Sequence, residues 1–331
     1  MKLEQHEITN TIALLDENGN ITEPGWARQS YYKYDRKKIK APATRVKEWD
    51  YYCILSRDYG LALTAADNGY IGFFAVTFFD FAKASEVSGS EMSVLPLGKY
   101  NFPSCSDSGN VNISESKIKM SFAFDGKKRV LKLNYPYFNK NQGISAKIEL
   151  THPSSEIYDR MVIATPFYKN GHFYFNEKHN CLSAVGKVKV GDAIYTFGNT
   201  DKNRAWAVLD WGRGVWTYKN TWYWGSASGA VDGVSFGFNL GYGFGDTKAA
   251  TENMLFYNGV AHKLDEVTFK IPIGENAKVE YLEPWKITSS DGRFEMVFKP
   301  LIDRSDDTNL LVIRSNQHQV FGYFSGIAVL D

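Results

Sequence analysis

Residues 251–264, "TENMLFYNGVAHKL", carry two short apolar runs that meet at the pair Asn258-Gly259. Both central residues of a type I′ turn need a positive φ, which an Asn-Gly pair tolerates better than most dipeptides. The segment therefore predicts a tight β-hairpin. A two-residue loop fixes its register, pairing Tyr257 with Val260, Leu255 with His262 and Met254 with Lys263.

The same turn signal recurs along the whole chain. Further pairs are Asn18-Gly19, Asn68-Gly69, Asp125-Gly126, Asn170-Gly171, Asp232-Gly233 and Asp291-Gly292. Aromatic residues make up 15% of the chain and glycines number 28, a combination that favours sheets, because rings fit a pleated surface and glycine allows turns. No segment of a dozen residues has a convincing 3.6-residue apolar period. We expect an all-β, mostly antiparallel protein.

The turn signals predict roughly sixteen to twenty strands at the usual spacing, more than one sandwich needs. Sheets of that size close into barrels or split. We therefore expect two tandem antiparallel lipocalin-like (calycin-type) barrels. The predicted domains are residues 1–177 and 178–331, with the join near residues 172–186, "HFYFNEKHNCLSAVG".

Charge and sequence composition exclude several classes of partner. The formal net charge is +1, from 38 basic and 37 acidic side chains, and gives no electrostatic reason to expect a nucleic acid or an anionic membrane. The N-terminus lacks the apolar core of a secretory signal, and no run approaches 18 apolar residues. Cys53, Cys105 and Cys181 lie far apart and read as reduced thiols. A soluble, cytoplasmic protein is expected.

The densest stretch for chemistry is "DWGRGVWTYKNTWYWGSASG", residues 210–229. In one unbroken strand Asp210 would lie on the same face as Trp216, Trp222 and Trp224, with Arg213 on the other face. Gly212 and Gly214 permit a bulge that would shift this phase, so the sequence leaves the facing open.

Two interpretations of this stretch follow. An aspartate beside indole rings loses hydration, which raises its pKa and lets it hold a proton for donation. Alternatively, Arg213 keeps Asp210 ionised in a buried ion pair. The candidate catalytic residues are Asp210 and Arg213, and Trp216, Trp222 and Trp224 are the candidate wall of a ligand cavity.

Two other segments supply candidate ligand-binding residues. In the 251–264 hairpin, Asn253 is diagonal to His262 on one face, and Glu252 is diagonal to Lys263 on the other. This is either a polar pair in a barrel mouth or an ordinary solvated hairpin with a Glu252–Lys263 surface ion pair. Further along the chain, His318 and Gln319 lead into an aromatic strand, as ligand contacts or as structural groups.

Other motifs are absent. The six histidines show neither HExxH nor paired spacing, so no metal is expected. The segment "GYGFGD", residues 241–246, is not GxGxxG and opens no helix, which argues against a dinucleotide. No GxSxG motif is present. We expect no cofactor.

Several segments together resemble a family of bacterial and fungal proteins described as a domain of unknown function. They are "ITEPGWAR" (21–28), "HNCLSAVGKV" (179–188), "LDWGRGVWTYKNTWYWGSASG" (209–229), "FNLGYG" (238–243), "TENMLFYNGVAHKL" (251–264) and "NLLVIRSNQHQVFGYFSG" (309–326). More distantly, the chain is similar to the double-lipocalin proteins that include carotenoid hydratase and tocopherol cyclase. That resemblance implies long isoprenoid substrates and protonation of an alkene by an aspartate, whose counterpart here is Asp210.

Three functions are therefore compared. The first is acid-catalysed hydration, cyclisation or isomerisation of a hydrophobic lipid- or isoprenoid-like molecule. The second is non-catalytic binding of a lipid or pigment, because a small barrel can enclose one apolar ligand. In the third, residues 210–229 are only a structural corner.

Overall fold

A computed structural model describes residues 4–152, 158–275, 277–310 and 313–331. This part of the chain forms 23 strands, one four-residue helix and three short 3-10 turns, which confirms the all-β prediction. Within the same residues, no helix has the length and apolar character needed to cross a bilayer.

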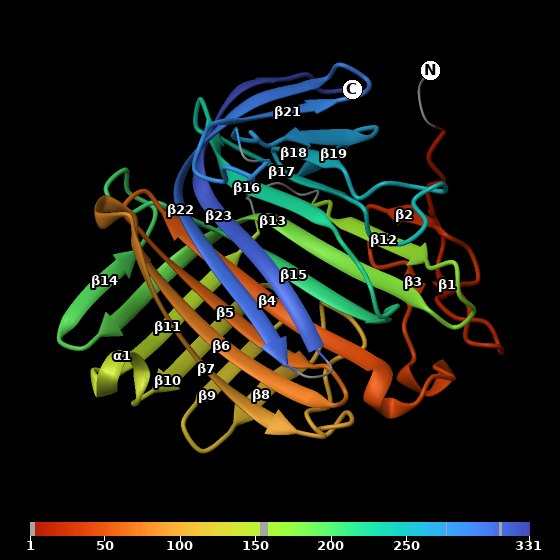
Figure 1. The fold of residues 1–331 in the computed structure, drawn as a ribbon, viewed down its shortest axis with the longest axis horizontal. Coiled ribbons are helices and arrows are strands. Elements are labelled where there is room, and N and C mark those ends of the chain that lie inside the picture. The colour runs from red at the N-terminus through yellow and green to blue at the C-terminus, as the bar shows by residue number, and fades with distance from the viewer. Residues whose placement is uncertain (1–3, 153–157, 276, 311–312) are drawn as a thin grey trace.

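Ten antiparallel strands form the path of a large, strongly curled sheet that resembles half a barrel (Figure 1). In spatial order they are β7 (Ser85–Val94), β6 (Ile71–Asp80), β5 (Tyr59–Asp67), β4 (Val46–Ser56), β15 (Ala205–Val215), β13 (Phe173–Val190), β11 (Ile144–Thr151), β10 (Lys128–Tyr135), β9 (Lys119–Phe124) and β8 (Asn110–Ser114). The curl brings the two edge strands together: Glu91 of β7 accepts hydrogen bonds from the backbone N–H groups of Lys117 and Ile118 in the β8–β9 turn.

Short elements complete this layer. Off the main path lie β2 (Gly25–Ala27), β12 (Met161–Pro166) and β14 (Ala193–Phe197), of which β12 and β14 pair with β13 and β2 pairs with β12. A separate parallel pair consists of β1 (Ile12–Ala13) and β3 (Tyr32–Lys33). The helical elements are η1 (Arg36–Lys38), η2 (Ala43–Arg45), η3 (Phe81–Lys83) and α1 (Phe138–Asn141).

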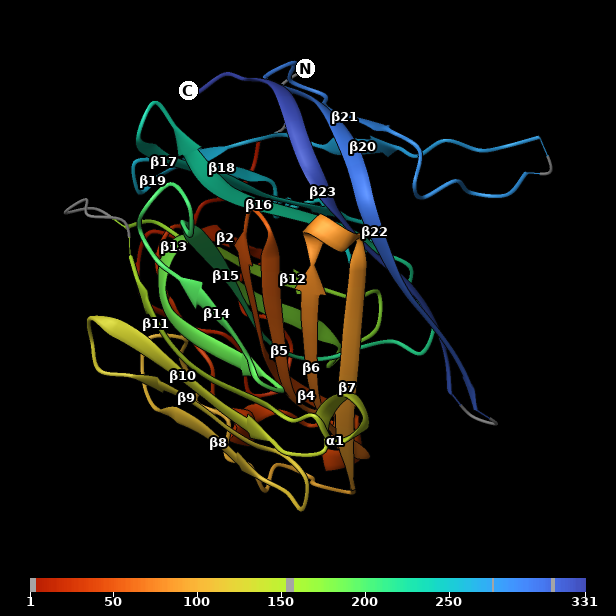
Figure 2. The same ribbon diagram turned by 90° about the vertical axis from the view of Figure 1, so that its left-hand side faces the viewer.

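Two four-stranded sheets cover the convex side of the large sheet (Figure 2). The middle sheet has the order β16 (Tyr223–Val231), β17 (Val234–Tyr242), β18 (Met254–Tyr257) and β19 (Val260–Lys263). The outer sheet has the order β20 (Val267–Lys270), β21 (Trp285–Ser289), β22 (Phe294–Leu310) and β23 (Ile313–Ala328). The long β22–β23 hairpin continues beyond the middle sheet, so that Ile302 packs with Cys53 and Val208 of the large sheet.

The predicted hairpin register is confirmed pair by pair between β18 and β19. Asn258-Gly259 and Asp232-Gly233 have positive φ at both residues, as a type I′ turn requires. In the other five Asn-Gly or Asp-Gly pairs only the glycine has a positive φ. The Asn-Gly and Asp-Gly pairs thus predicted the chain reversals correctly. They predicted the type I′ geometry correctly at only these two turns.

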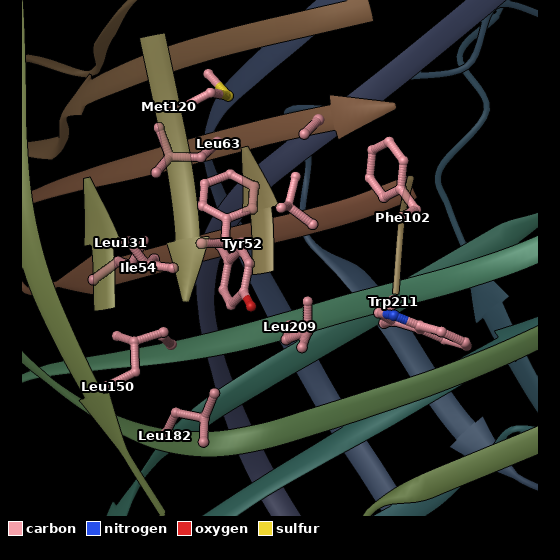
Figure 3. Packing of buried hydrophobic residues seen from close by; sticks show 14 of the residues in the cluster. Tyr52, Ile54, Leu63, Phe102, Met120, Leu131, Leu150, Leu182, Leu209 and Trp211 are labelled. Carbon is pink, nitrogen blue, oxygen red and sulfur yellow. The ribbon is translucent and has the colours of Figure 1, made fainter. Parts of the chain in front are cut away.

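An apolar core fills the concave side of the large sheet (Figure 3). Because side chains alternate along a strand, one set of β4 and β15 residues points inward. Tyr52, Ile54, Leu209 and Trp211 belong to this set and are almost completely buried. The opposite set points toward the middle sheet and includes Asp210.

Strand β15 is regular through both glycines, since its pairing with β4 runs without a break from Ala205 to Val215. The bulge that Gly212 and Gly214 permit does not form. A Cβ at residue 212 would lie 1.9 Å from Cζ2 of Trp49, so glycine is required there because the indole ring lies across the strand. Asp210 and Arg213 consequently point to opposite faces of the large sheet.

The chain therefore has one large half-barrel sheet and two smaller sheets. Residues 177 and 178, at which the sequence divided the chain, are neighbours within β13.

Gly212→Ala should lower the free energy of unfolding by about 2 kcal/mol or more, because the new methyl group overlaps the Trp49 ring. Urea unfolding measures the change. The matched control is Gly229→Ala in β16, where a Cβ meets no atom within 4 Å. Equal stability of the two variants would contradict the assigned packing of Trp49.

Candidate functional site

Asp210 lies in the middle of the large sheet, on the face toward the middle sheet. Strand pairing places Lys178 of β13 directly opposite it on one side and Tyr51 of β4 on the other. The Lys178 ammonium lies 2.8 Å from Oδ1 of Asp210, and the Asn176 side-chain amide donates to the same oxygen at 2.7 Å. The Trp49 indole N–H also donates to it, at 3.3 Å. The carboxylate is thus held by three donors while 17% of its side chain stays exposed.

The middle sheet supplies a second carboxylate, Glu252. Its Oε2 accepts a hydrogen bond from the side-chain amide of Asn239 at 3.0 Å, and Oδ1 of Asn239 accepts one from the Trp224 indole N–H at 2.7 Å. Gly241 leaves room for the acid, since a Cβ there would lie 2.3 Å from Oε1 of Glu252. Asn239, which is fully buried, therefore orients both the acid and the indole.

Lys178 joins the two halves of this arrangement. Its side chain is 2% exposed, and its ammonium lies 4.6 Å from the centroid of the Trp224 ring. A buried ammonium is stable only when it is paired, so Asp210 and Trp224 together explain how a lysine can occupy this position. We call the following set the Asp210 cluster: Trp49, Asn176, Lys178, Asp210, Trp224, Asn239 and Glu252.

The two carboxyl groups of the cluster occupy different environments. Burial raises the pKa of Glu252, and the positive charge of Lys178 only partly opposes this effect. Asp210, in contrast, contacts the ammonium directly. Pairs of titratable groups in unequal environments are the usual basis for dividing acid and base roles. The raised pKa of Glu252 makes it a candidate proton donor.

Aromatic rings surround the Asp210 cluster. Trp49 stacks on Tyr174 at 6.2 Å between ring centroids and meets Trp216 edge-on at 5.3 Å. Tyr51 meets Trp224 edge-on at 6.4 Å. Of the three predicted wall residues, Trp224 and Trp216 lie close to the cluster. Trp222 lies farther out, against Trp216, and is 44% exposed.

Arg213 does not contact Asp210, so the predicted ion pair between them is wrong. Its guanidinium lies on the concave face, donates to Asp50 at 3.2 Å and to the Pro103 carbonyl at 2.9 Å, and covers the Trp211 ring at 3.8 Å. The reason is the unbroken alternation of β15, which separates residues three apart onto opposite faces. Lys178, not Arg213, is the cationic partner of Asp210.

A second buried polar network lies on the concave face of β13. The Ser106 hydroxyl lies 2.5 Å from Oε2 of Glu177 and 2.8 Å from Nε2 of His179. Arg129 and Arg160 both contact Asp107, the next residue along the same loop. These contacts, with those of Arg213, fasten the 95–109 loop across the open end of the half-barrel, and a cavity of only about 10 Å³ remains beside it.

The other predicted ligand-binding residues scatter. The Asn253 side chain accepts a hydrogen bond from the backbone N–H of Gly241 and donates one to the carbonyl of Asp265, and Asn253 is part of the lining of the larger cavity described below. His262 contacts Asp331, and His318 contacts Asp303 and stacks on Tyr281. Gln319 lies nearer the cluster, because its amide donates to the Tyr51 hydroxyl at 2.8 Å.

Glu252 and Lys263 do not form the surface ion pair that was one of the two expectations for this hairpin. Each has other partners. Lys263 donates to the Thr251 hydroxyl at 2.9 Å and to the Asn253 carbonyl at 2.8 Å. Burial lowers its pKa to about 7. Glu252 instead accepts from Asn239.

Sequence reasoning missed the β13 residues, although a signal was present. Residues 176–180, "NEKHN", are five consecutive polar residues in the middle of an apolar strand, and all five are buried. Alternation sends Asn176, Lys178 and Asn180 to the convex face and Glu177 and His179 to the concave face. Because both faces of β13 are buried here, each polar side chain needs a hydrogen-bond or charge partner on its own face of the sheet.

A larger cavity, of about 360 Å³, lies between the middle and outer sheets. Its lining includes Gly241, Thr251, Asn253, Thr268 and Thr288. Neither this cavity nor the small one is lined by Asp210. Glu252 is not among the residues that line the larger cavity, although Gly241, which lies against Glu252, is.

Comparison with protein families gives a match over residues 5–331 to a domain of unknown function, DUF2804. The chain belongs to the DUF2804 family. This confirms the family resemblance expected from the sequence segments. No curated protein matches the chain at a significant level.

Solved structures similar to this DUF2804 chain include three proteins. A candidate AttH from Nitrosomonas europaea has a TM-score of 0.50 and 12% identity, covering 90% of this chain and 97% of that one. Kievitone hydratase from Nectria haematococca has a TM-score of 0.50 and 11% identity, covering 90% and 95%. CghA has a TM-score of 0.51 and 10% identity, covering 98% and 93%. At such identities the likeness concerns the fold.

The buried histidines make stability depend on pH. Burial, with the charges of Arg129 and Arg160, holds the pKa of His179 well below its usual 6.5, and burial lowers the pKa of His152 to about 4. Between these values and 6.5 the unfolded chain binds more protons than the folded one. The free energy of unfolding should therefore fall as the pH drops from about 6.5 toward 4.

Urea unfolding at a series of pH values measures this slope. His179→Gln keeps a donor for Ser106 but cannot be protonated, so its slope should be shallower than that of the unchanged protein. An identical slope in both would show that His179 does not cause the effect.

Proposed function

We propose that the protein binds a hydrophobic, lipid- or isoprenoid-like molecule beside the Asp210 cluster and transforms it by protonation, through hydration, cyclisation or isomerisation. One observation carries the proposal: Asp210 pairs with a buried lysine among indole rings, and the charge of the same lysine acts on a second carboxyl group, Glu252, whose pKa burial raises. The fold it shares with kievitone hydratase, a hydratase by name, supports the same class of reaction.

In the proposed reaction, neutral Glu252 gives its proton to one carbon of an alkene. The adjacent carbon becomes cationic, and the faces of Trp224 and Trp49 stabilise that charge through their π electrons. The Asp210 carboxylate adds a fixed negative charge on the same side. Lys178 keeps Asp210 in place and sets the orientation of the pair.

The cation can then react in three ways that balance. Water adds to it and loses a proton, which gives an alcohol. A second alkene of the same molecule adds to it, which closes a ring and leaves a new cation that loses a proton from an adjacent carbon. Alternatively, a carbon next to the first cation loses a proton, which moves the double bond. In each case a carboxylate receives the released proton, and Glu252 is protonated again for the next turnover.

Non-catalytic binding of a lipid or pigment is the second candidate function. The observation that favours it is the set of three donors on Asp210, which leaves this carboxylate little capacity to take part in proton transfer. Two lipocalin-like barrel units, divided at residues 177 and 178, belong to this proposal, because such barrels hold single apolar ligands.

Turnover is tested with geraniol, geranylgeraniol and squalene in D₂O, with mass spectrometry of the extracted products. Protonation from an exchangeable acid adds one deuterium to carbon. Glu252→Gln should lower the rate by about 100-fold or more, as loss of a general acid does. Asp210→Asn should lower it as well, and the exposed Glu283→Gln is the control. Full turnover by Glu252→Gln would remove the assigned acid.

Binding is tested separately with all-trans-retinol, by energy transfer from tryptophan. Trp224→Ala should weaken binding by about tenfold, the change expected for loss of about 1.4 kcal/mol of ring contact. Tyr137→Ala, an exposed ring at α1, is the control. Solvent extraction of protein purified without detergent then separates the two functions, since an unchanged co-purified lipid supports binding without catalysis.

A further inference from the structure

Five strands of the large sheet end side by side at one end of that sheet. The first residue of β4 pairs with the last residue of β15. That last residue of β15 also pairs with the first residue of β13, which pairs in turn with the last residue of β12. The last residue of β5 pairs with Glu48, near the start of β4. This end lies to the right in Figure 1, and α1 lies to the left, at the other end.

The loops at this end expose aromatic rings. Tyr218 is 86% exposed and Trp222 is 44% exposed, both in the loop after β15. Tyr168, in the β12–β13 turn, is 81% exposed, and Tyr70, between β5 and β6, is 37% exposed. Rings that a folded chain leaves in water at neighbouring loops indicate a surface that meets something else.

Basic side chains alternate with these rings. The guanidinium of Arg45 lies 3.8 Å from the Tyr218 ring centroid, and the ammonium of Lys47 lies 4.8 Å from that of Tyr70. The ammonium of Lys248 lies 5.9 Å from the Tyr168 ring, and Lys219 is exposed in the β15–β16 loop.

Ring contacts through Trp216 and the buried Phe244 connect these rings and cations. Lys47 also lies 5.5 Å from Trp216, which contacts Trp222, and Trp222 contacts Phe244. Phe244 contacts Phe167, the residue before Tyr168. We call this surface the aromatic–basic rim.

Acidic groups beside the rim do not balance its charge. Asp67 is fully buried, and its two oxygens accept from the backbone of Gly69 and Gly98. Asp246 lies 3.8 Å from Lys248 and offsets that one lysine. Lys219 is exposed, whereas Arg45 and Lys47 are half-buried at the rim, and burial lowers the pKa of Lys47 to about 8.

We propose that the aromatic–basic rim docks on the surface of an anionic lipid bilayer. Tyr and Trp rings prefer the headgroup region, where one end is apolar and the other is wet. Lys and Arg beside them are attracted to acidic headgroups, by about 1 kcal/mol for each residue near the surface. Rings that project from three separate loops at the end of a sheet suit a flat partner.

The rim also leads to the Asp210 cluster. Trp216 contacts Trp49, whose indole N–H donates to Asp210, so two successive contacts connect the rim to the proposed place of binding. This last step rests on the proposed function, whereas docking itself does not.

The test is co-sedimentation of the full chain with vesicles of phosphatidylcholine, with and without phosphatidylglycerol. The protein should sediment with the anionic vesicles, and high salt should release it, because salt screens exposed charges. Lys219→Gln should lower the partition coefficient by roughly fivefold, whereas Lys248→Gln should lower it less, because Asp246 already offsets that charge. Tyr168→Ser with Trp222→Ser should lower it independently of salt.

The control is Tyr137→Ser with Lys140→Gln at α1, which removes an exposed ring and an exposed lysine from the opposite end of the sheet and should leave binding unchanged. Equal sedimentation of rim and control variants would overturn the proposal, as would equal binding to neutral vesicles or no binding. A concentration-dependent dimer that the rim variants abolish would assign the rim to a second copy of the chain. No substrate is present, so a failure of the proposed reaction leaves this measurement unaffected.

Discussion

The ion pair between Lys178 and Asp210 is the interaction on which the arrangement between the large and middle sheets depends. An ammonium that is 2% exposed is strongly destabilising unless a carboxylate lies against it. Removal of either partner leaves a charge between two sheets, beside Glu252 and Trp224. The same pair therefore stabilises the packing of two layers and sets the charge distribution of the candidate site.

Strand β13 explains how one chain can maintain two separate charged networks. Its residues 176–180 are all polar, and alternation sends them by turns to the two faces of the large sheet. On the concave face Glu177 and His179 bind the loop that closes the half-barrel. On the convex face Lys178 and Asn176 bind Asp210. Function is proposed only for the convex network, because the concave one is enclosed by the core.

The sequence predicted what local chemistry decides. The all-β class and the pairing in the 251–264 hairpin followed from turn residues, and an unbroken β15 would place Asp210 and Arg213 on opposite faces, as the structure does. The sequence alone could not decide between a bulge and a regular strand at Gly212. A glycine is required there because of the Trp49 ring, which lies 163 positions earlier in the chain. Lys178 and Glu252 were not linked to Asp210 for the same reason: their proximity comes from sheet pairing between distant segments.

The near-zero net charge of the chain conceals how its charges are distributed. At the end of the large sheet, Asp67 is buried and accepts hydrogen bonds from backbone N–H groups, and Asp246 pairs with Lys248, while Arg45 lies against the exposed Tyr218 ring. A sum over all residues cancels these contributions, but a partner a few ångströms away is affected only by the nearest charges, because salt screens the rest beyond about 8 Å. Composition therefore argued correctly against a chain that is basic throughout, and it carried no information about a local basic surface.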